Sequence, residues 1–127
     1  MKAEAEEHFR KAQNLLGACR TLMDAGYHAD AVSRAYYCMF HAAKAVLVED
    51  GIERSSHRAV ISAFGLFFVK GGRFDRDMQE SFWQAFNMRS DGDYAPCSAI
   101  QKEDAEQVAE AASNFLMKCL EFLQSRT

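Results

Sequence analysis

The sequence predicts an all-α fold, an antiparallel helical bundle with four long helices and a shorter fifth. Apolar residues recur three and four positions apart in five segments, and this spacing places them on one face of a helix. The 127 residues include one proline, so little interrupts long helices. The length suits a single domain over residues 1–127, and the chain shows no internal repeat.

The first predicted helix carries a regular apolar stripe and ends near Gly26. The stripe alternates steps of four and three residues: Ala5, Phe9, Ala12, Leu16, Cys19 and Met23. Gly26 suits the left-handed backbone that follows a helix C-terminus. Only a few residues separate this helix from the next, so the two should form an antiparallel pair.

The second predicted helix begins between His28 and Asp30, ends before Gly51 and has two distinct faces. One face is apolar and should form a wall of the core: Val32, Ala35, Tyr36, Met39, Ala43, Val46 and Leu47. The other carries polar groups at helical spacing: Arg34, Tyr37, His41 and Lys44. This second face offers cations, a phenol and an imidazole, and the pattern alone leaves open whether it is functional.

The third predicted helix starts at a serine and stops at a pair of glycines. Ser55 or Ser56 is expected to be its N-cap, accepting a hydrogen bond from the first turn. Gly71 and Gly72 should end it. Its expected apolar face is Val60, Ile61, Phe64, Phe67 and Phe68.

The fourth and fifth predicted helices complete the bundle. Asp75 or Asp77 should cap the fourth, which is expected to fray between residues 88 and 96 because Gly92 and Pro96 disfavour helix there. Its apolar face is Met78, Phe82, Ala85 and Phe86. Acidic residues favour the start of the fifth helix: Glu103, Asp104 and Glu106. Its core stripe is Val108, Ala112, Phe115, Cys119 and Phe122.

Charge and motif content argue against several classes of protein. The formal net charge of −3 gives no global nucleic-acid signature, although residues 54–76 hold five cations and one acid. This basic run is either an ordinary solvated surface or a phosphate-facing edge. No histidine follows a glutamate by three positions and no CxxC pair occurs, so we expect no metal and no cofactor.

Cellular location follows from the same composition. The apolar runs are too short to span a bilayer, and the N-terminal residues are charged throughout. We therefore expect no membrane association and a cytoplasmic protein. Cys19 and Cys119 fall on apolar stripes and are interpreted as small, reduced core residues.

Three stretches together resemble one known family. They are SRAYYCMFHAAKAVL (residues 33–47), SSHRAVISAFGLFFVKGG (55–72) and MRSDGDYAP (88–96). Their order and spacing are similar to those of the HEPN superfamily, the higher eukaryotes and prokaryotes nucleotide-binding domain, over nearly the whole chain. The resemblance implies a helical bundle that commonly forms homodimers. It also implies a role such as that of a toxin paired with a small nucleotidyltransferase-type antitoxin.

The resemblance implies a site as well. Active members are metal-independent ribonucleases with an Arg-x(4–6)-His motif, in which the guanidinium holds the phosphate and the imidazole moves the 2′-hydroxyl proton. Arg89 matches the arginine, but Tyr94 stands where Arg-x4-His would place the imidazole. With a reference pKa of ~10, a phenol is about three units too basic to be largely ionised at pH 7, and the neighbouring Asp93 is a far weaker base. His57 or His41 could substitute in space, or could instead serve as a capping or interhelical hydrogen-bonding residue.

The sequence and the resemblance together give candidate site residues and three hypotheses about function. The candidate catalytic residues are Arg89 and His57, and the RNA- or nucleotide-binding candidates are Arg34, Tyr37, His41, Arg58, Asp93 and Tyr94. The first hypothesis is a dimeric RNA- or nucleotide-binding module with a nucleotidyltransferase-type partner. The second is a metal-independent endoribonuclease toxin with a rearranged general base, and the third is a structural dimerisation module without a ligand. The missing histidine favours binding over catalysis.

Overall fold

The computed structural model describes the backbone of residues 1–94 and 99–126, together with their side chains except those of residues 92–94. Regular structure in this part of the chain is helical throughout, so the predicted all-α bundle is confirmed. The elements are α1 (Ala3–Asp24), α2 (His28–Glu49), α3 (His57–Phe64), η1 (Gly65–Val69), α4 (Arg76–Tyr94) and α5 (Lys102–Ser125). The short additional helix is α3, third along the chain, and the π-helical turn η1 continues it.

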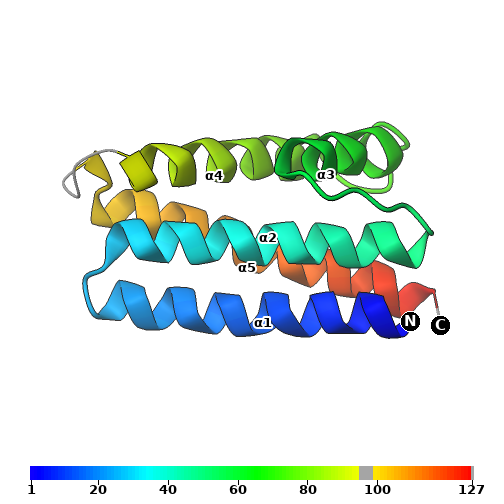
Figure 1. Cartoon of the computed structure of the whole chain (residues 1–127), viewed down its shortest axis with the longest axis horizontal. Coiled ribbons are helices and arrows are strands. Elements are labelled where there is room, and N and C mark those ends of the chain that lie inside the picture. The colour runs from blue at the N-terminus through cyan, green and yellow to red at the C-terminus, as the bar shows by residue number, and fades with distance from the viewer. Residues whose placement is uncertain (95–98, 127) are drawn as a thin grey trace.

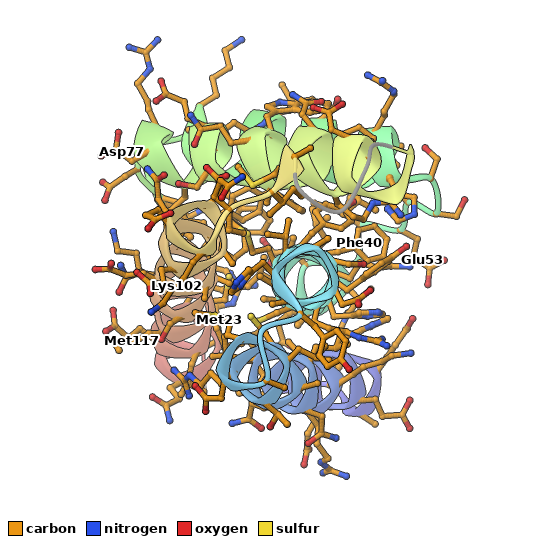
Figure 2. All side chains as sticks on the ribbon, turned by 90° about the vertical axis from the view of Figure 1, so that its left-hand side faces the viewer. Met23, Phe40, Glu53, Asp77, Lys102 and Met117 are labelled. Atoms are coloured by element: carbon orange, nitrogen blue, oxygen red, sulfur yellow. The ribbon has the colours of Figure 1, made fainter. Side chains whose placement is uncertain are left out.

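The bundle is built around α2. α1 lies antiparallel to α2 on one side, and the layer that contains α3 and α4 lies on the opposite side (Figure 1). α5 packs along a third side, so α2 is the central rod in the end-on view (Figure 2). The two ends of the chain lie at the same end of the bundle (Figure 1).

The sequence of α2 explains its central position. Every residue of the predicted apolar face is buried, and six further residues of α2 are also buried: Ala31, Cys38, Phe40, Ala42, Ala45 and Val48. Burying a large side chain such as Met39 or Leu47 stabilises the fold by roughly 1.5–3 kcal/mol relative to exposing it. Between residues 31 and 48, only one narrow stripe of α2 escapes burial: Ser33, Arg34, Tyr37, His41 and Lys44. The predicted polar face is therefore the single strip of this part of α2 that reaches the surface.

Local signals at the helix ends match the predictions. The apolar stripe of α1 is buried except for Met23, which is partly buried at the edge of the core. Gly26 follows α1 with φ 87°, in the left-handed region that favours glycine. Ser56, rather than Ser55, is the N-cap of α3, because its Oγ accepts a hydrogen bond of 3.1 Å from the N–H of Ala59.

The expectation that Phe67 belongs to the core was wrong. The helix widens at Gly65, whose carbonyl accepts from Lys70 N–H at 2.9 Å, and the wider turn leaves Phe67 37% exposed while Phe68 is buried. A tertiary contact from α4 accompanies this turn. The side chain of Gln79 lies against Gly65, and its Nε2 donates to the carbonyl of Ile61 at 3.1 Å.

The last two helices agree with their expected ends. α4 begins directly after Asp75, and it ends at Tyr94 within the window predicted to fray, whereas Pro96 lies outside the described residues. α5 begins with a reciprocal capping box between Gln101 and Asp104. No helix in the described part of the chain is long and apolar enough to cross a membrane.

Candidate functional site

The buried hydroxyl of Tyr36 connects α2 to the start of α3. Tyr36 is 0% exposed, and its Oη lies 2.6 Å from Nδ1 of His57. His57 is the first residue of α3, directly after the cap at Ser56, so the helix start fixes where the imidazole stands. Burial raises the pKa of Tyr36, and the phenol therefore stays protonated.

The Tyr36–His57 hydrogen bond bears on which imidazole nitrogen carries the proton. If the phenol only accepted from Nδ1, its own proton would be buried without a partner, at a cost of about 1–3 kcal/mol. We infer from this cost that the phenol donates to Nδ1 and that neutral His57 carries its proton on Nε2. In this tautomer the outer nitrogen is a hydrogen-bond donor and has no lone pair with which to act as a base.

Arg89 reaches the same place from α4. One terminal nitrogen of its guanidinium donates to the hydroxyl of Tyr37 at 3.0 Å. The guanidinium carbon lies 5.5 Å from the ring centroids of both Tyr36 and Tyr37, and 5.9 Å from that of Phe86. These distances suit cation–π attraction, which holds a cation against aromatic rings. The charge of Arg89 is therefore positioned by side chains from α2 and α4 and remains partly exposed.

His57 lies among the same aromatic rings. Its ring centroid is 5.7 Å from that of Tyr37, 4.8 Å from that of Phe40 and 6.1 Å from that of Phe86. Burial lowers the pKa of His57, and the positive charge of Arg89 lowers it further. The imidazole is therefore neutral at pH 7, and Arg89 supplies the positive charge. We call the following set the Arg89 cluster: Tyr36, Tyr37, His57, Phe86 and Arg89.

His41 does not join the Arg89 cluster through a hydrogen bond. Its Nδ1 lies 3.0 Å from Nδ1 of His8 on α1, and the two rings are stacked at 5.3 Å. The ring of Phe40 links the two places, because it packs against both His41 (5.3 Å) and His57 (4.8 Å). Burial lowers the pKa of His41 to about 4, with a further contribution from His8. Of the two roles considered for His41, the structure shows the interhelical hydrogen bond.

The other candidate residues lie around the cluster at different distances. Arg58 follows His57 and places its guanidinium carbon 5.3 Å from the ring centroid of Phe86. Arg34 is exposed on α2, about one turn before Tyr37. Asp93 and Tyr94 form the last residues of α4, one turn beyond Arg89, and their side chains lie outside the described residues.

Two residues that make these ring and hydrogen-bond contacts were not predicted from the sequence. Phe40 falls between the two stripes of α2, yet it stands four residues after Tyr36 and three after Tyr37, and such spacing could have identified it. His8 belongs to the polar side of α1, and no pattern in the sequence indicated its contact with His41. Among the residues that the structure describes, no three His, Cys, Asp or Glu side chains are grouped so that they could hold a metal ion.

Comparison with known proteins gives matches along most of the chain. A family model described as HEPN domain matches residues 5–122. A protein of Methanocaldococcus jannaschii named "Putative toxin MJ0142" is 34% identical over 125 residues, covering 98% of this chain and 85% of the relative. A second protein of that archaeon, "Putative toxin MJ0605", is 31% identical over 116 residues, covering 91% of this chain and 86% of the relative. The UPF0332 protein glr0978 of Gloeobacter violaceus is 30% identical over 124 residues, covering 97% and 98%.

Solved structures share the fold at lower sequence identity. The crystal structure of TT1696 from Thermus thermophilus has a TM-score of 0.83 at 16% identity, covering 94% of this chain and 98% of that one. The crystal structure of ST0689, described as an archaeal HEPN homologue, has a TM-score of 0.68 at 18% identity, covering 95% and 98%. These two likenesses concern the arrangement of the helices.

Proposed function

The chain belongs to the HEPN domain family, and we propose that it is an RNA- or nucleotide-binding module in which Arg89 holds a phosphate group. The observation that carries this proposal is how neighbouring side chains hold the guanidinium of Arg89. Its guanidinium lies against three aromatic rings and is tied to the Tyr37 hydroxyl, so it is pre-ordered before any ligand arrives. A planar guanidinium matches the oxygens of a phosphate in a bidentate arrangement, which an ammonium cannot reproduce.

His57 complements Arg89 as a neutral donor. Because Tyr36 donates to Nδ1, the Nε2–H of His57 can donate to a phosphate oxygen. The lowered pKa of His57 keeps this imidazole uncharged at pH 7. Arg89 and His57 thus offer one charged and one neutral donor from neighbouring helices to a single anion.

The same tautomer favours binding over cleavage. A metal-independent ribonuclease needs a group that accepts the 2′-hydroxyl proton, and Nε2–H of His57 cannot do so. The family motif would place its histidine where Tyr94 stands. Both observations support a module that holds RNA or a nucleotide without cutting it, in preference to an endoribonuclease toxin.

The proposal extends to partners. The names of the two Methanocaldococcus jannaschii relatives support a toxin-type role. We propose that the chain acts as a homodimer in the cytoplasm, with a nucleotidyltransferase-type antitoxin as its partner. Two measurements test this part: light scattering on a size-exclusion column should give twice the mass of the 14.3 kDa chain, and the adjacent gene should encode a small nucleotidyltransferase. A monomeric mass would refute the homodimer, and a different neighbouring gene would refute this assignment of the partner.

One binding experiment separates the three hypotheses. Fluorescence anisotropy with labelled RNA and with labelled nucleotide, in EDTA, should show saturable binding by the wild-type protein. A denaturing gel of the same samples should show intact RNA. Cleavage that disappears in Arg89→Ala would instead establish a ribonuclease, and absence of binding to either ligand would leave the structural dimerisation module.

A further inference from the structure

The surface strip of α2 continues beyond the Arg89 cluster. It runs from Arg34 through Tyr37 and His41 to Lys44, and every other residue between Arg34 and Lys44 is buried. Ten residues of α-helix at ~1.5 Å per residue give the strip a length of about 15 Å. α1 borders it on one side, and α3 and α4 border it on the other.

A cavity lies at the Lys44 end of the strip. It has a volume of about 510 Å³ and lies between the start of α1, the second half of α2 and residues 53–56. Lys44 and Arg54 supply its cations, Ser55 and Ser56 supply hydroxyl groups, and Glu4 and Glu53 also line it. Figure 2 shows Phe40 leaving α2 on the same side of the bundle as Glu53, away from Lys102 and Met117 of α5.

Both cations of the cavity are held in place by neighbouring groups. Lys44 Nζ lies 5.7 Å from the ring centroid of Phe40, the residue that also packs against His57. Arg54 donates through Nη1 to the backbone carbonyl of Glu53 at 2.7 Å. Of the two acidic side chains, that of Glu4 points along its own helix α1 toward His8, since its Oε1 lies 4.0 Å from Nε2 of His8. An anion in the cavity would therefore lie on the side of Lys44 and Arg54.

The centre of the strip carries rings instead of charges. His8 and His41 form their hydrogen-bonded pair there, and the pKa of each is lowered by burial first and by nearby lysines as well. Both imidazoles are therefore largely neutral at pH 7. Cations at two ends with aromatic and hydrogen-bonding groups between them are typical of surfaces that follow a single nucleic-acid strand.

We propose that Lys44 and Arg54 form a second phosphate subsite, and that the ligand is a single-stranded RNA segment instead of a free mononucleotide. This rests on the proposed function, since it takes Arg89 to hold the first phosphate. At about 3.4 Å per nucleotide, a strip of about 15 Å accommodates roughly four stacked nucleotides. The strand lies along α2, with one phosphate at the Arg89 cluster and another at the cavity.

The test compares ligand lengths with matched variants. Affinity is measured by anisotropy for labelled AMP and for RNA of two, four and eight nucleotides. For the double variant Lys44→Ala/Arg54→Ala we expect about a tenfold weaker affinity for the four- and eight-nucleotide RNA, with unchanged affinity for AMP. The slope of log affinity against log salt should fall by about 0.7, since the variant loses one phosphate contact and each such contact on a single strand contributes about 0.7. A control variant, Arg20→Ala/Lys102→Ala, removes two cations from the α1 and α5 surfaces and should change neither quantity.

The outcomes separate this inference from the proposed function. If Arg89→Ala weakens all ligands but the Lys44/Arg54 variant weakens none, the second subsite is refuted and the proposed function stands. An equal loss for AMP and for long RNA would also refute it, because the two cations would then act only through the general charge. If Arg89→Ala weakens nothing, the proposed function itself fails. Circular dichroism at the assay temperature confirms that each variant is folded.

Discussion

The hydroxyl of Tyr36 lies 2.6 Å from Nδ1 of His57, and this contact joins the most buried helix of the bundle to the first residue of α3. The contact gives a hydrogen-bond partner to the Tyr36 hydroxyl, which has no access to water. We infer from it that the imidazole proton is on Nε2. The burial of Tyr36 in the core thereby influences which hydrogen-bonding group His57 presents at the surface.

The tautomer of His57 is the first prediction. We expect neutral His57 in the free protein to carry its proton on Nε2, because the buried phenol donates to Nδ1. Nitrogen-15 chemical shifts of the imidazole report the tautomer directly. Tyr36→Phe removes the donor and should allow the other tautomer to appear, while lowering the free energy of unfolding by about 0.5–1.5 kcal/mol. Finding the proton on Nδ1 in the wild-type protein would remove the argument against a catalytic base.

The His8–His41 pair makes stability depend on pH. Both groups have a pKa below the ordinary 6.5 in the folded protein, with that of His41 at about 4, so the unfolded chain binds more protons between these values. The free energy of unfolding should therefore be highest above pH 6.5 and should fall as the pH decreases from 6.5 toward 4. We expect a loss of roughly 1–2 kcal/mol over this range, less than the full shift would give because both side chains are partly solvated.

Urea unfolding at pH 7.5 and at pH 5 measures this effect. His41→Gln should reduce the pH dependence without abolishing it, since glutamine does not titrate but His8 and His57 keep their lowered pKa values. His28→Gln should leave the pH dependence in place. A wild-type protein with the same free energy of unfolding at both pH values would contradict the inferred burial of the pair.

Alanine substitution should lower the free energy of unfolding at Gly65, in the π-helical turn, and raise it at Gly17, in α1. A Cβ added at Gly65 would lie 2.7 Å from Nε2 of Gln79, so Gly65→Ala should displace that side chain and break its hydrogen bond to Ile61. The net cost should be about 1 kcal/mol, because displacing the half-buried Gln79 side chain and losing its hydrogen bond outweigh the gain in helix propensity. Gly17→Ala is the matched control, since nothing lies within 4 Å of the added methyl, and it should stabilise α1 by about 0.5–1 kcal/mol. Equal effects of the two substitutions on urea unfolding would show that Gln79 does not maintain the turn.

Much of the fold could be predicted from the sequence because it depends on periodicity along single helices. The buried face of α2 from Val32 to Leu47 and the serine cap of α3 are local patterns. The error at Phe67 has a different origin: the widened turn is contacted by Gln79, which comes from another helix. No periodicity within residues 57–72 carries that information.

The candidate site, like the fold, could be predicted only where it depends on patterns within one helix or on the family motif. The polar stripe of α2 was predictable, and the family motif identified Arg89 as a candidate site residue, which stays a prediction. The contact between Tyr36 and His57 was not, because it depends on where residues 50–56 return the chain beside α2. Likewise, His41 could be placed on a polar face, but its partner His8 is 33 positions away on a different helix.

The most direct test of phosphate binding by Arg89 compares Arg89→Ala and Arg89→Lys with the wild-type protein. Affinity for an eight-nucleotide RNA is measured by anisotropy in EDTA, and Arg20→Ala serves as the control. Loss of charge-assisted hydrogen bonds should weaken binding about ten- to one-hundredfold in Arg89→Ala. Arg89→Lys should recover only part of that loss, because lysine keeps the charge but not the planar fork. Folded Arg89→Ala protein that binds this RNA as tightly as the wild type would contradict the proposed role of Arg89.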